Sequence, residues 1–252
     1  MKTLFITGGD LRHKYIVYKF SRFFKNYKCI IEKRDLNIKH KILSKNKSYK
    51  RHIENFNFYQ RKNFEKYKNK FDKKKIIKTI YRNRTNNKIF NKIVRKIIYN
   101  YKPDLIFSYG CQILEIKKIS KKIMGYNIHG GLLPFYRGVN TNFWPHYNKD
   151  SSKVGVSLHK IENRVDSGVV YFTIRPIIKK NSTINSLSCD AIKKFGSIVP
   201  KKFYLITKNK KKLKGKVFKK IYKSWRKKDF SPSMIDIANT NFKNYKKKFL
   251  RS

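Results

Sequence analysis

The amino-acid sequence predicts an α/β fold: a mainly parallel, twisted sheet flanked by helices, with a helical insertion and a short basic C-terminal extension. Two observations lead to this fold class. Short buried apolar runs alternate with stretches of helical periodicity, and several of these runs end in polar or Gly-rich turns. The 252 residues, 40% of them hydrophobic, are enough for one sizeable core. We therefore expect a domain at residues 1–206, with the insertion at 36–100 and the extension at 207–252.

The first elements are expected to be a strand, a turn and a helix. The apolar run at 2–7 is typical of a buried strand, and the Gly-Gly-Asp sequence at 8–10 is typical of a turn. Asp10 is a suitable N-cap for a helix over 11–24, because its side chain can accept a hydrogen bond from the first turn. A second short strand is expected at 29–31.

The insertion is predicted to be helical. From residue 35 to residue 75 the chain is polar, with aromatic residues at spacings that suit an amphipathic helix. The isoleucines of 76–100 continue this pattern, so both stretches are interpreted as one interrupted helical insertion. A further helix is predicted at 112–122.

The second half of the chain again alternates strands and helices. Buried parallel strands are predicted at 105–107 and 126–128. The stretches 154–161 and 169–174 alternate apolar and polar residues on either side of a turn, which predicts a hairpin-like pair. A long helix is expected at 183–206. Ligands of such folds bind beyond the carboxyl ends of the strands, so polar residues that follow the strands are expected to converge on one crevice.

The C-terminal extension is strongly basic from Lys208 onward. We expect it to form a linker or a small hairpin, and then a terminal helix after the Ser-Pro-Ser sequence at 231–233.

The formal net charge of +50 has two interpretations. A polyanionic partner such as tRNA would be attracted by such a surface through counterion release. Alternatively, AT-rich codons account for the excess of Lys over Arg and for the abundance of Asn, Ile, Tyr and Phe. The lysines are spread along the whole chain rather than gathered in one stripe, so we favour codon usage and do not favour a nucleic acid as the partner.

The three cysteines, Cys29, Cys111 and Cys189, are widely spaced and contain no Cys-x-x-Cys pair. This pattern argues against a disulfide framework and against a zinc cluster, so no metal is expected. No stretch approaches the roughly 18 apolar residues of a membrane span, and the N-terminal apolar run is too short for a signal peptide. We expect a cytoplasmic protein without a membrane partner; the sequence does not indicate its oligomeric state.

One group of polar residues has the side chains that a catalytic site requires. Asn127 and His129 lie two residues apart at the end of a predicted strand, so their side chains point to the same side. Asp166 lies in a Gly-flanked turn, where we expect its carboxylate to stay exposed. An amide, an imidazole and a carboxylate together are suited to stabilising an oxyanion and transferring a proton.

The motifs around these residues are more specific than any one of them. Asn-x-His at 127–129 is followed by Leu-Leu-Pro-x-x-x-Gly at 132–138, by Gly-x-x-x-His at 155–159 and by Asp-x-Gly at 166–168. This order and spacing resemble those of the folate-dependent formyltransferases. That family includes the glycinamide ribonucleotide, methionyl-tRNA and sugar N-formyltransferases. The resemblance covers roughly residues 78–205.

The resemblance implies a catalytic triad of Asn127, His129 and Asp166, with 10-formyltetrahydrofolate as co-substrate and a small-molecule amine as acceptor. In the implied reaction the amine attacks the formyl carbon, and Asn127 donates a hydrogen bond to the developing oxyanion. His129 stabilises the oxyanion as well and passes a proton to the departing folate nitrogen. Asp166 holds His129 in its productive charge state and helps to deprotonate the amine.

The same resemblance implies where the two substrates bind. The segment that cradles the folate ring with its backbone corresponds to Cys111, Gln112, Ile113 and Leu114. On the acceptor side, the loop after the first strand binds a phosphate in the glycinamide ribonucleotide enzymes. Here the matching candidates are Gly9, Arg12 and His13, together with Arg137 of the Leu-Leu-Pro motif. Asp10 would repel a phosphate at this position, a repulsion that Arg12 and His13 are able to offset; this puts the purine-pathway substrate in doubt.

Each candidate also has a structural interpretation. His129 can be a satisfied histidine at a strand end, Asp166 an ordinary turn residue and Asn127 a cap; the combination favours catalysis. His159 is interpreted as structural, His13 as a surface residue and Cys111 as a packed side chain rather than a reactive thiol. Arg137 is equally consistent with a solvated loop charge.

We expect a formyltransferase that acts on an amino sugar or sugar nucleotide. Glycinamide ribonucleotide is the first alternative acceptor. The second alternative is a methionyl-tRNA formyltransferase-like protein, favoured only by charge, although the roughly 45 residues after Ile206 are too few for the C-terminal β-barrel of those enzymes. A non-catalytic basic RNA-binding protein on the same scaffold is the third.

Overall fold

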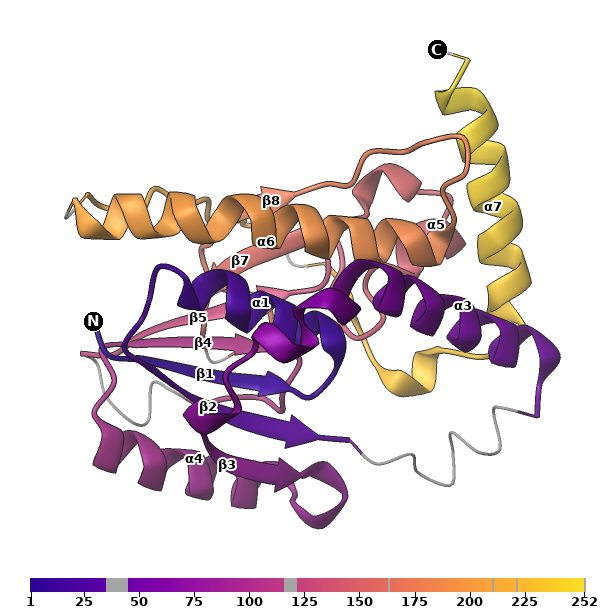
Figure 1. Cartoon of the computed structure of the whole chain (residues 1–252). Coiled ribbons are helices and arrows are strands. Elements are labelled where there is room, and N and C mark those ends of the chain that lie inside the picture. Colours follow the sequence, from indigo (N-terminus) through magenta and orange to yellow (C-terminus); the bar gives the residue numbers. More distant parts are fainter. Residues whose placement is uncertain (35–44, 116–121, 163, 210, 221, 252) are drawn as a thin grey trace.

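The computed structural model describes residues 1–34, 45–115, 122–162, 164–209, 211–220 and 222–251. The strands are β1 (Thr3–Gly8), β2 (Tyr27–Lys33), β3 (Ile76–Tyr81), β4 (Leu105–Tyr109), β5 (Met124–His129), β6 (Arg137–Gly138), β7 (Val156–Lys160), β8 (Val170–Ile174) and β9 (Ser224–Trp225). Within the described residues, seven of them form one sheet in the order β3-β2-β1-β4-β5-β7-β8 (Figure 1). Strands β1 to β5 run parallel to one another. Strand β7 pairs antiparallel with both β5 and β8. The expected mainly parallel sheet is confirmed.

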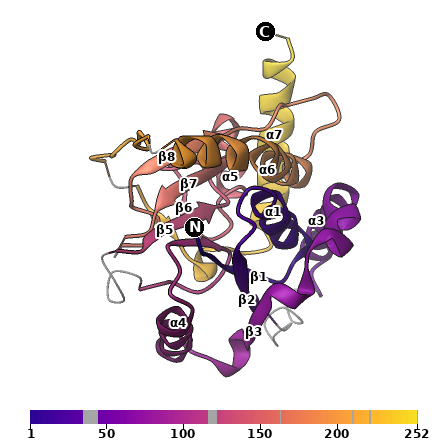
Figure 2. The same cartoon turned by 60° about the vertical axis from the view of Figure 1, so that its left-hand side comes forward.

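Helices cover both faces of this sheet. They are α1 (Leu11–Ser21), α3 (Lys47–Phe64), α4 (Asn87–Tyr101), α5 (Trp144–Tyr147), α6 (Ile184–Lys208) and α7 (Met234–Phe249). Short 3-10 helices are η1 (Glu65–Lys70), η2 (Lys73–Lys75), η3 (Arg82–Arg84), η5 (Ser151–Lys153) and η6 (Lys227–Asp229). Figure 2 shows α1, α3 and α6 on one face and α4 on the other. None of the helices in the described part of the chain is long and apolar enough to cross a membrane.

The core has two layers because successive residues of the central strands point to opposite faces. On the α1 and α6 face, the ring of Phe107 lies 5.6 Å from that of Phe5 and 5.2 Å from that of Phe203, between centroids. On the other face, Leu4 and Ile6 belong to the apolar cluster that α4 covers. Both layers bury β1 and β4 completely, as the continuous apolar runs of these strands predict.

The predicted helical insertion at 36–100 is only partly helical. Helices α3 and α4 fall within or at the edge of this range, but residues 76–81 form β3, which pairs in parallel with β2 at the edge of the sheet. The helical prediction for 76–81 is therefore wrong. The Ile-Ile-Lys-Thr-Ile-Tyr sequence of β3 is rich in β-branched residues, which pack well on a pleated surface.

The helix predicted at 112–122 has no counterpart in residues 112–115, which the structure describes without regular secondary structure. Residues 116–121 lie outside the described part of the chain. The other predictions agree with the structure: the hairpin-like pair is β7 and β8, and the long helix is α6.

The described residues of the C-terminal extension form no hairpin of their own; the strand β9 pairs instead with the preceding domain. Lys216 bridges to Val170 of β8, and β9 pairs in parallel with β6. The indole of Trp225 stacks on that of Trp144, with 4.0 Å between the centroids. Helix α7, predicted to follow residues 231–233, packs against α5. The extension therefore shares a core with the domain, in a cluster that includes Trp144 and Phe242.

Two histidines, the buried His146 and the partly buried His52, lie where α7 meets the domain. The ring of His146 is fully buried, its Nδ1 lies 2.9 Å from the hydroxyl of Ser151, and its face lies against Phe242. Burial lowers the pKa of His146 to about 3 and the pKa of His52 to about 4. Neutral rings are therefore part of the folded state.

Acid is expected to destabilise the fold through these two rings. Both bind protons more readily in the unfolded chain, so their stabilising contribution is complete above pH 6.5 and is lost as the pH falls towards 4. At pH 5 the loss is about 2 kcal/mol for each ring. Urea unfolding at pH 7.5 and pH 5.0 measures it. The variant His52→Gln, His146→Gln should show a smaller pH dependence than the natural protein; an equal pH dependence would contradict the assignment.

Candidate active site

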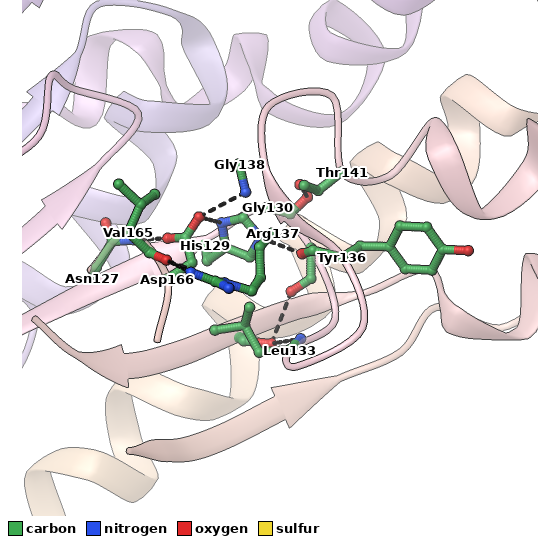
Figure 3. Close-up of polar contacts among 12 residues, drawn as sticks. Asn127, His129, Gly130, Leu133, Tyr136, Arg137, Gly138, Thr141, Val165 and Asp166 are labelled. Carbon is green, nitrogen blue, oxygen red and sulfur yellow. Dashed lines mark hydrogen bonds and ion pairs between the residues drawn. The ribbon is translucent and has the colours of Figure 1, made fainter. Parts of the chain in front are cut away.

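The polar side chains of Asn127 and His129 lie on β5, at the carboxyl end of the parallel part of the sheet. Because they are two residues apart on one strand, both point to the same face. Asp166 reaches them from the loop between β7 and β8, and Figure 3 shows the three side chains directed toward one another. The structure therefore brings the three predicted site residues together.

The carboxylate of Asp166 is the centre of this cluster. Its Oδ2 lies 3.3 Å from Nδ1 of His129 and accepts a 2.9 Å hydrogen bond from the backbone N–H of Gly138. Its Oδ1 accepts a 3.3 Å hydrogen bond from the Asn127 amide. Asp166 adopts a left-handed backbone conformation with φ of 51°, which Asp tolerates better than most residues.

The prediction that the Asp166 carboxylate is exposed is wrong, because only 7% of this side chain is exposed. Burial alone would raise the pKa of Asp166, but the two neighbouring imidazoles, His129 and His159, and the Gly138 N–H outweigh it. The pKa of Asp166 therefore lies well below its usual range, and the carboxylate is charged at neutral pH.

Both ring nitrogens of His129 face oxygen atoms. Nδ1 faces Asp166, and Nε2 lies 2.8 Å from the backbone carbonyl of Tyr136. Burial lowers the pKa of His129, whereas Asp166 and the Tyr136 carbonyl oppose this shift. With an oxygen acceptor at each nitrogen, the doubly protonated ring makes two hydrogen bonds and the neutral ring only one. These two oxygens therefore offset part of the cost that burial imposes on an imidazolium at this position.

His159 is a fourth member of the cluster that the sequence analysis interpreted as structural. Its Nε2 lies 3.0 Å from the Asn127 amide nitrogen and 3.3 Å from Oδ1 of Asp166. Its Nδ1 lies 2.8 Å from the carbonyl of Lys160. The antiparallel register pairs His159 directly with Asn127 across β7 and β5. The Gly-x-x-x-His motif was the available signal, but it does not show which residue His159 faces.

The amide of Asn127 is held from both ends. Its Oδ1 accepts a 2.8 Å hydrogen bond from the hydroxyl of Ser108 on β4, which fixes the amide so that its nitrogen faces Asp166 and His159. Unlike His129, Asn127 is partly exposed. It is therefore the group of the triad that an incoming molecule reaches most directly.

Gly131 leaves room for the His129 ring. A Cβ at Gly131 would lie 2.6 Å from Nε2 of His129 and equally close to Thr141. The hydroxyl of Thr141 in turn donates a 2.7 Å hydrogen bond to the carbonyl of Gly130. The absence of a side chain at Gly131 therefore allows the loop to approach the imidazole closely.

The segment expected to bind the folate, Cys111 to Leu114, follows β4 at the same edge of the sheet. Two of its backbone groups are already held: the N–H of Gln112 donates to Glu32, and the carbonyl of Ile113 accepts from Asn91. The side-chain nitrogen of Gln112 is buried without a partner among the described residues. An orphaned amide donor in this segment fits a ligand that presents an acceptor. Burial raises the pKa of the Cys111 thiol to about 12, so it is no nucleophile.

The candidates around the first turn make mainly internal contacts. Arg12 donates to Gln60 and pairs with Asp10, each at 2.7 Å. His13 is buried rather than on the surface, because its ring fills the space that Gly8 and Gly110 leave by having no Cβ. Gly9 is partly exposed at the end of β1.

Arg34 is a cation near this turn that the sequence analysis did not single out. It donates a 2.8 Å hydrogen bond to the carbonyl of Gly110. Burial and the neighbouring guanidinium groups of Arg82 and Arg12 lower its pKa. Nothing in the sequence distinguishes Arg34 from the many other basic residues.

Arg137 is directed at backbone carbonyls. Its Nε lies 3.2 Å from the carbonyl of Val165, to which Nη2 also donates, and its Nη1 donates a 3.1 Å bond to the carbonyl of Tyr222. Arg137 also lines a cavity of about 260 Å³ beside Asp166. Its predicted role in substrate binding stays a prediction. In the described residues, no group of three or more His, Cys, Asp or Glu side chains is arranged to hold a metal ion.

Two curated relatives match part of the chain. The bifunctional polymyxin resistance protein ArnA of Wigglesworthia glossinidia brevipalpis is 32% identical over 111 residues, 43% of this chain and 17% of that protein. The GDP-perosamine N-formyltransferase of Brucella melitensis biotype 1 is 33% identical over 91 residues, 35% of this chain and 34% of that enzyme. The matched region thus spans a third or less of these relatives' length.

Solved structures share the fold over most of the chain. A sugar N-formyltransferase from a Shewanella species has a TM-score of 0.56 at 14% identity, covering 96% of this chain and 87% of that one. The sugar 3N-formyltransferase WlaRD, solved with dTDP and 5-N-formyl-THF, has a TM-score of 0.52 at 22% identity, covering 92% and 72%. The formyl transferase family model matches residues 30–201, more than half of the sequence. The chain belongs to the formyl transferase family.

Proposed function

We propose that this protein transfers a formyl group from 10-formyltetrahydrofolate to a primary amine of an amino sugar or sugar nucleotide. The observation that carries the proposal is the meeting of Asn127, His129 and Asp166 within 3.3 Å at the carboxyl edge of the sheet. A partly exposed amide, an imidazole and a charged carboxylate are the groups that acyl transfer to an amine requires.

The folate donor is supported by the segment after β4. The Gln112 amide nitrogen, which has no partner among the described residues, is suited to an acceptor at the polar edge of a folate ring. Among the proteins of similar fold, WlaRD was solved in the presence of 5-N-formyl-THF, which supports a folate as the donor. Metal chemistry is not required, because the oxyanion is stabilised by hydrogen bonds.

In the proposed reaction the amine nitrogen attacks the formyl carbon, and the carbonyl oxygen becomes an oxyanion. Asn127 donates a hydrogen bond to that oxygen, and His129 as imidazolium stabilises it. Breaking the bond between the formyl carbon and the folate nitrogen completes the transfer, with a proton passing to the leaving nitrogen from His129. Asp166 stabilises the imidazolium at 3.3 Å and accepts the amine proton, directly or through water.

Substrate binding must rearrange one contact of Asn127. Both protons of its amide face partners, His159 at 3.0 Å and Asp166 at 3.3 Å. The longer of the two exceeds the usual N–H···O distance of about 2.9–3.0 Å and is the weaker bond. We propose that this proton turns to the oxyanion as the formyl group arrives. Catalytic hydrogen bonds commonly tighten only in the reacting complex.

The amino sugar is supported by one relative and by charge at the neighbouring strand ends. The Brucella relative is a GDP-perosamine N-formyltransferase, and its named acceptor is a sugar nucleotide. Here Gly9, Arg12 and Arg34 lie beyond β1 and β2. Strand β4 separates β1 from β5, so an anion at Gly9 lies about 10 Å from an amine at Asn127. A sugar with an attached diphosphate bridges such a distance.

A panel of acceptors tests this proposal. Purified protein is incubated with 10-formyltetrahydrofolate and, in turn, with nucleotide-linked amino sugars, glycinamide ribonucleotide and methionyl-tRNA. We expect an N-formyl product, identified by mass spectrometry, and release of tetrahydrofolate only with an amino sugar nucleotide. Turnover with the ribonucleotide alone would reassign the acceptor. No folate turnover with any amine would reject the proposed activity.

A further inference from the structure

Arg137 is a buried cation whose contacts are all to main-chain oxygens in the described residues. Only 7% of the residue is exposed, yet its hydrogen-bond partners are carbonyls rather than a carboxylate. One edge of the guanidinium donates to the carbonyl of Val165, the residue before Asp166. Nη1 donates to Tyr222 in the C-terminal extension, 85 residues away. The side chain thus ties two distant segments together.

Gly138, the residue after Arg137, contacts the side chain of Asp166. The N–H of Gly138 donates to the Asp166 carboxylate at 2.9 Å. The N–H of Val139, one residue further, donates to the carbonyl of Trp225 at 2.9 Å. Arg137 and Gly138 form β6. This short strand therefore donates hydrogen bonds both to the carbonyl of Val165 and to the carboxylate of Asp166.

The conformation of Asp166 requires hydrogen bonds of this kind to hold it in place. Its backbone is left-handed, with φ of 51°, a conformation that residues with a Cβ adopt less readily than glycine. The carboxylate also contacts Asn127, His129 and His159, and the described part of the loop has a local bond from the Ser167 hydroxyl to the carbonyl of Arg164. Without the fork of Arg137, the peptide between Val165 and Asp166 can rotate, and the carboxylate then moves away from His129.

We infer that Arg137 is a positioning residue for Asp166, and that residues 222–225 of the C-terminal extension anchor it. The inference rests on the proposed function for its kinetic test but not for its structural test. Lysine cannot replace arginine here, because an ammonium lacks the planar fork that reaches both carbonyls at once. The inference also accounts for a basic side chain that the Leu-Leu-Pro motif places beside the site without exposing it.

The variant Arg137→Lys separates positioning from substrate binding. It keeps the positive charge and loses the hydrogen bonds from one guanidinium to the carbonyls of Val165 and Tyr222. We expect kcat to fall on the order of 100-fold, as for other displacements of about 1 Å at a reacting group. The KM values for donor and acceptor should stay within a few-fold of those of the natural protein. A raised acceptor KM with unchanged kcat would overturn the inference and make Arg137 a ligand of a substrate anion.

A measurement without turnover completes the test. NMR titration of the His129 ring in the ligand-free protein reports its contact with Asp166. Because Asp166 raises the pKa of His129, Arg137→Lys should lower that pKa while the local cation is retained. An unchanged His129 titration would overturn positioning even if the protein proved inactive on every amine, so the two failures are distinguishable.

The control and the fallback use other positions. Arg175, an exposed residue that follows β8, is changed to Lys and should alter neither kcat nor the His129 titration. If Arg137→Lys fails to fold, Trp225→Phe weakens the stack on Trp144 that docks β9. It should lower kcat and the His129 pKa in the same direction. A folded Trp225→Phe protein with both values unchanged would remove the extension from the inference.

Discussion

Replacing Asp166 with Asn is expected to lower kcat on the order of 1000-fold while leaving the protein folded. Asn has the same shape, tolerates the left-handed backbone at this position, and can still accept the hydrogen bond from Gly138. It lacks the charge that stabilises the His129 imidazolium. Initial rates with saturating donor and acceptor measure the effect.

The matched control is Asp150→Asn. Asp150 accepts from the phenol of Tyr136 and pairs with Lys153, so it touches the same loop from outside the catalytic cluster. Its kcat should stay close to that of the natural protein. An Asp166→Asn protein that retains full activity would mean that His129 does not depend on the carboxylate for its charge.

Replacing His129 with Ala is expected to lower kcat on the order of 1000-fold or more. The change removes the cation that the Asp166 carboxylate and the Tyr136 carbonyl are placed to stabilise. Because the ring also fills buried space, circular dichroism and a thermal melt must accompany the rate measurement. Binding of the donor should persist, since the groups assigned to it follow β4.

His52→Gln is the control for the loss of a partly buried histidine. Its ring contacts Asn185 and Phe143, away from the triad, so it should cost stability without lowering kcat in the folded protein. If His129→Ala binds donor and acceptor and still turns over at the natural rate, the imidazole has no part in the chemistry.

Local pattern was sufficient for most of the sheet. The runs at 105–107 and 126–128 are short, apolar and bounded by turn residues, so they could be identified as buried strands. The error at 76–81 has a physical cause. Ile76, Ile77 and Ile80 have a spacing that also suits a helix, and their partner β2 supplies the pairing only in three dimensions.

The triad could be predicted because Asn127 and His129 share one strand and the motif places Asp166 at a fixed distance along the chain. Its surroundings could not. The burial of Asp166 depends on the N–H of Gly138, and the place of His159 depends on the register between β5 and β7. Arg34 acquires meaning only from its place at the strand ends, where it donates to the carbonyl of Gly110.

The pairing of β6 with β9 was beyond any local pattern, because each strand has two residues and they lie far apart in the sequence. Gly138 alone carried a hint. It has a φ of 90°, and a Cβ there would lie 2.1 Å from the carbonyl of Trp225. A glycine at the end of the Leu-Leu-Pro motif therefore marks a close backbone approach whose partner the sequence does not name.

The link from Arg137 to Tyr222 also sets an order of events during synthesis. The ribosome makes residues 1–209 first, and these contain every strand of the sheet and all three triad side chains. The hydrogen bond from Arg137 to Tyr222 and the pairing of β9 with β6 form only after Tyr222 and Trp225 have left the exit tunnel. If Arg137 positions Asp166 as proposed, a nascent chain forms its sheet first and reaches full activity only once residues 222–225 have docked.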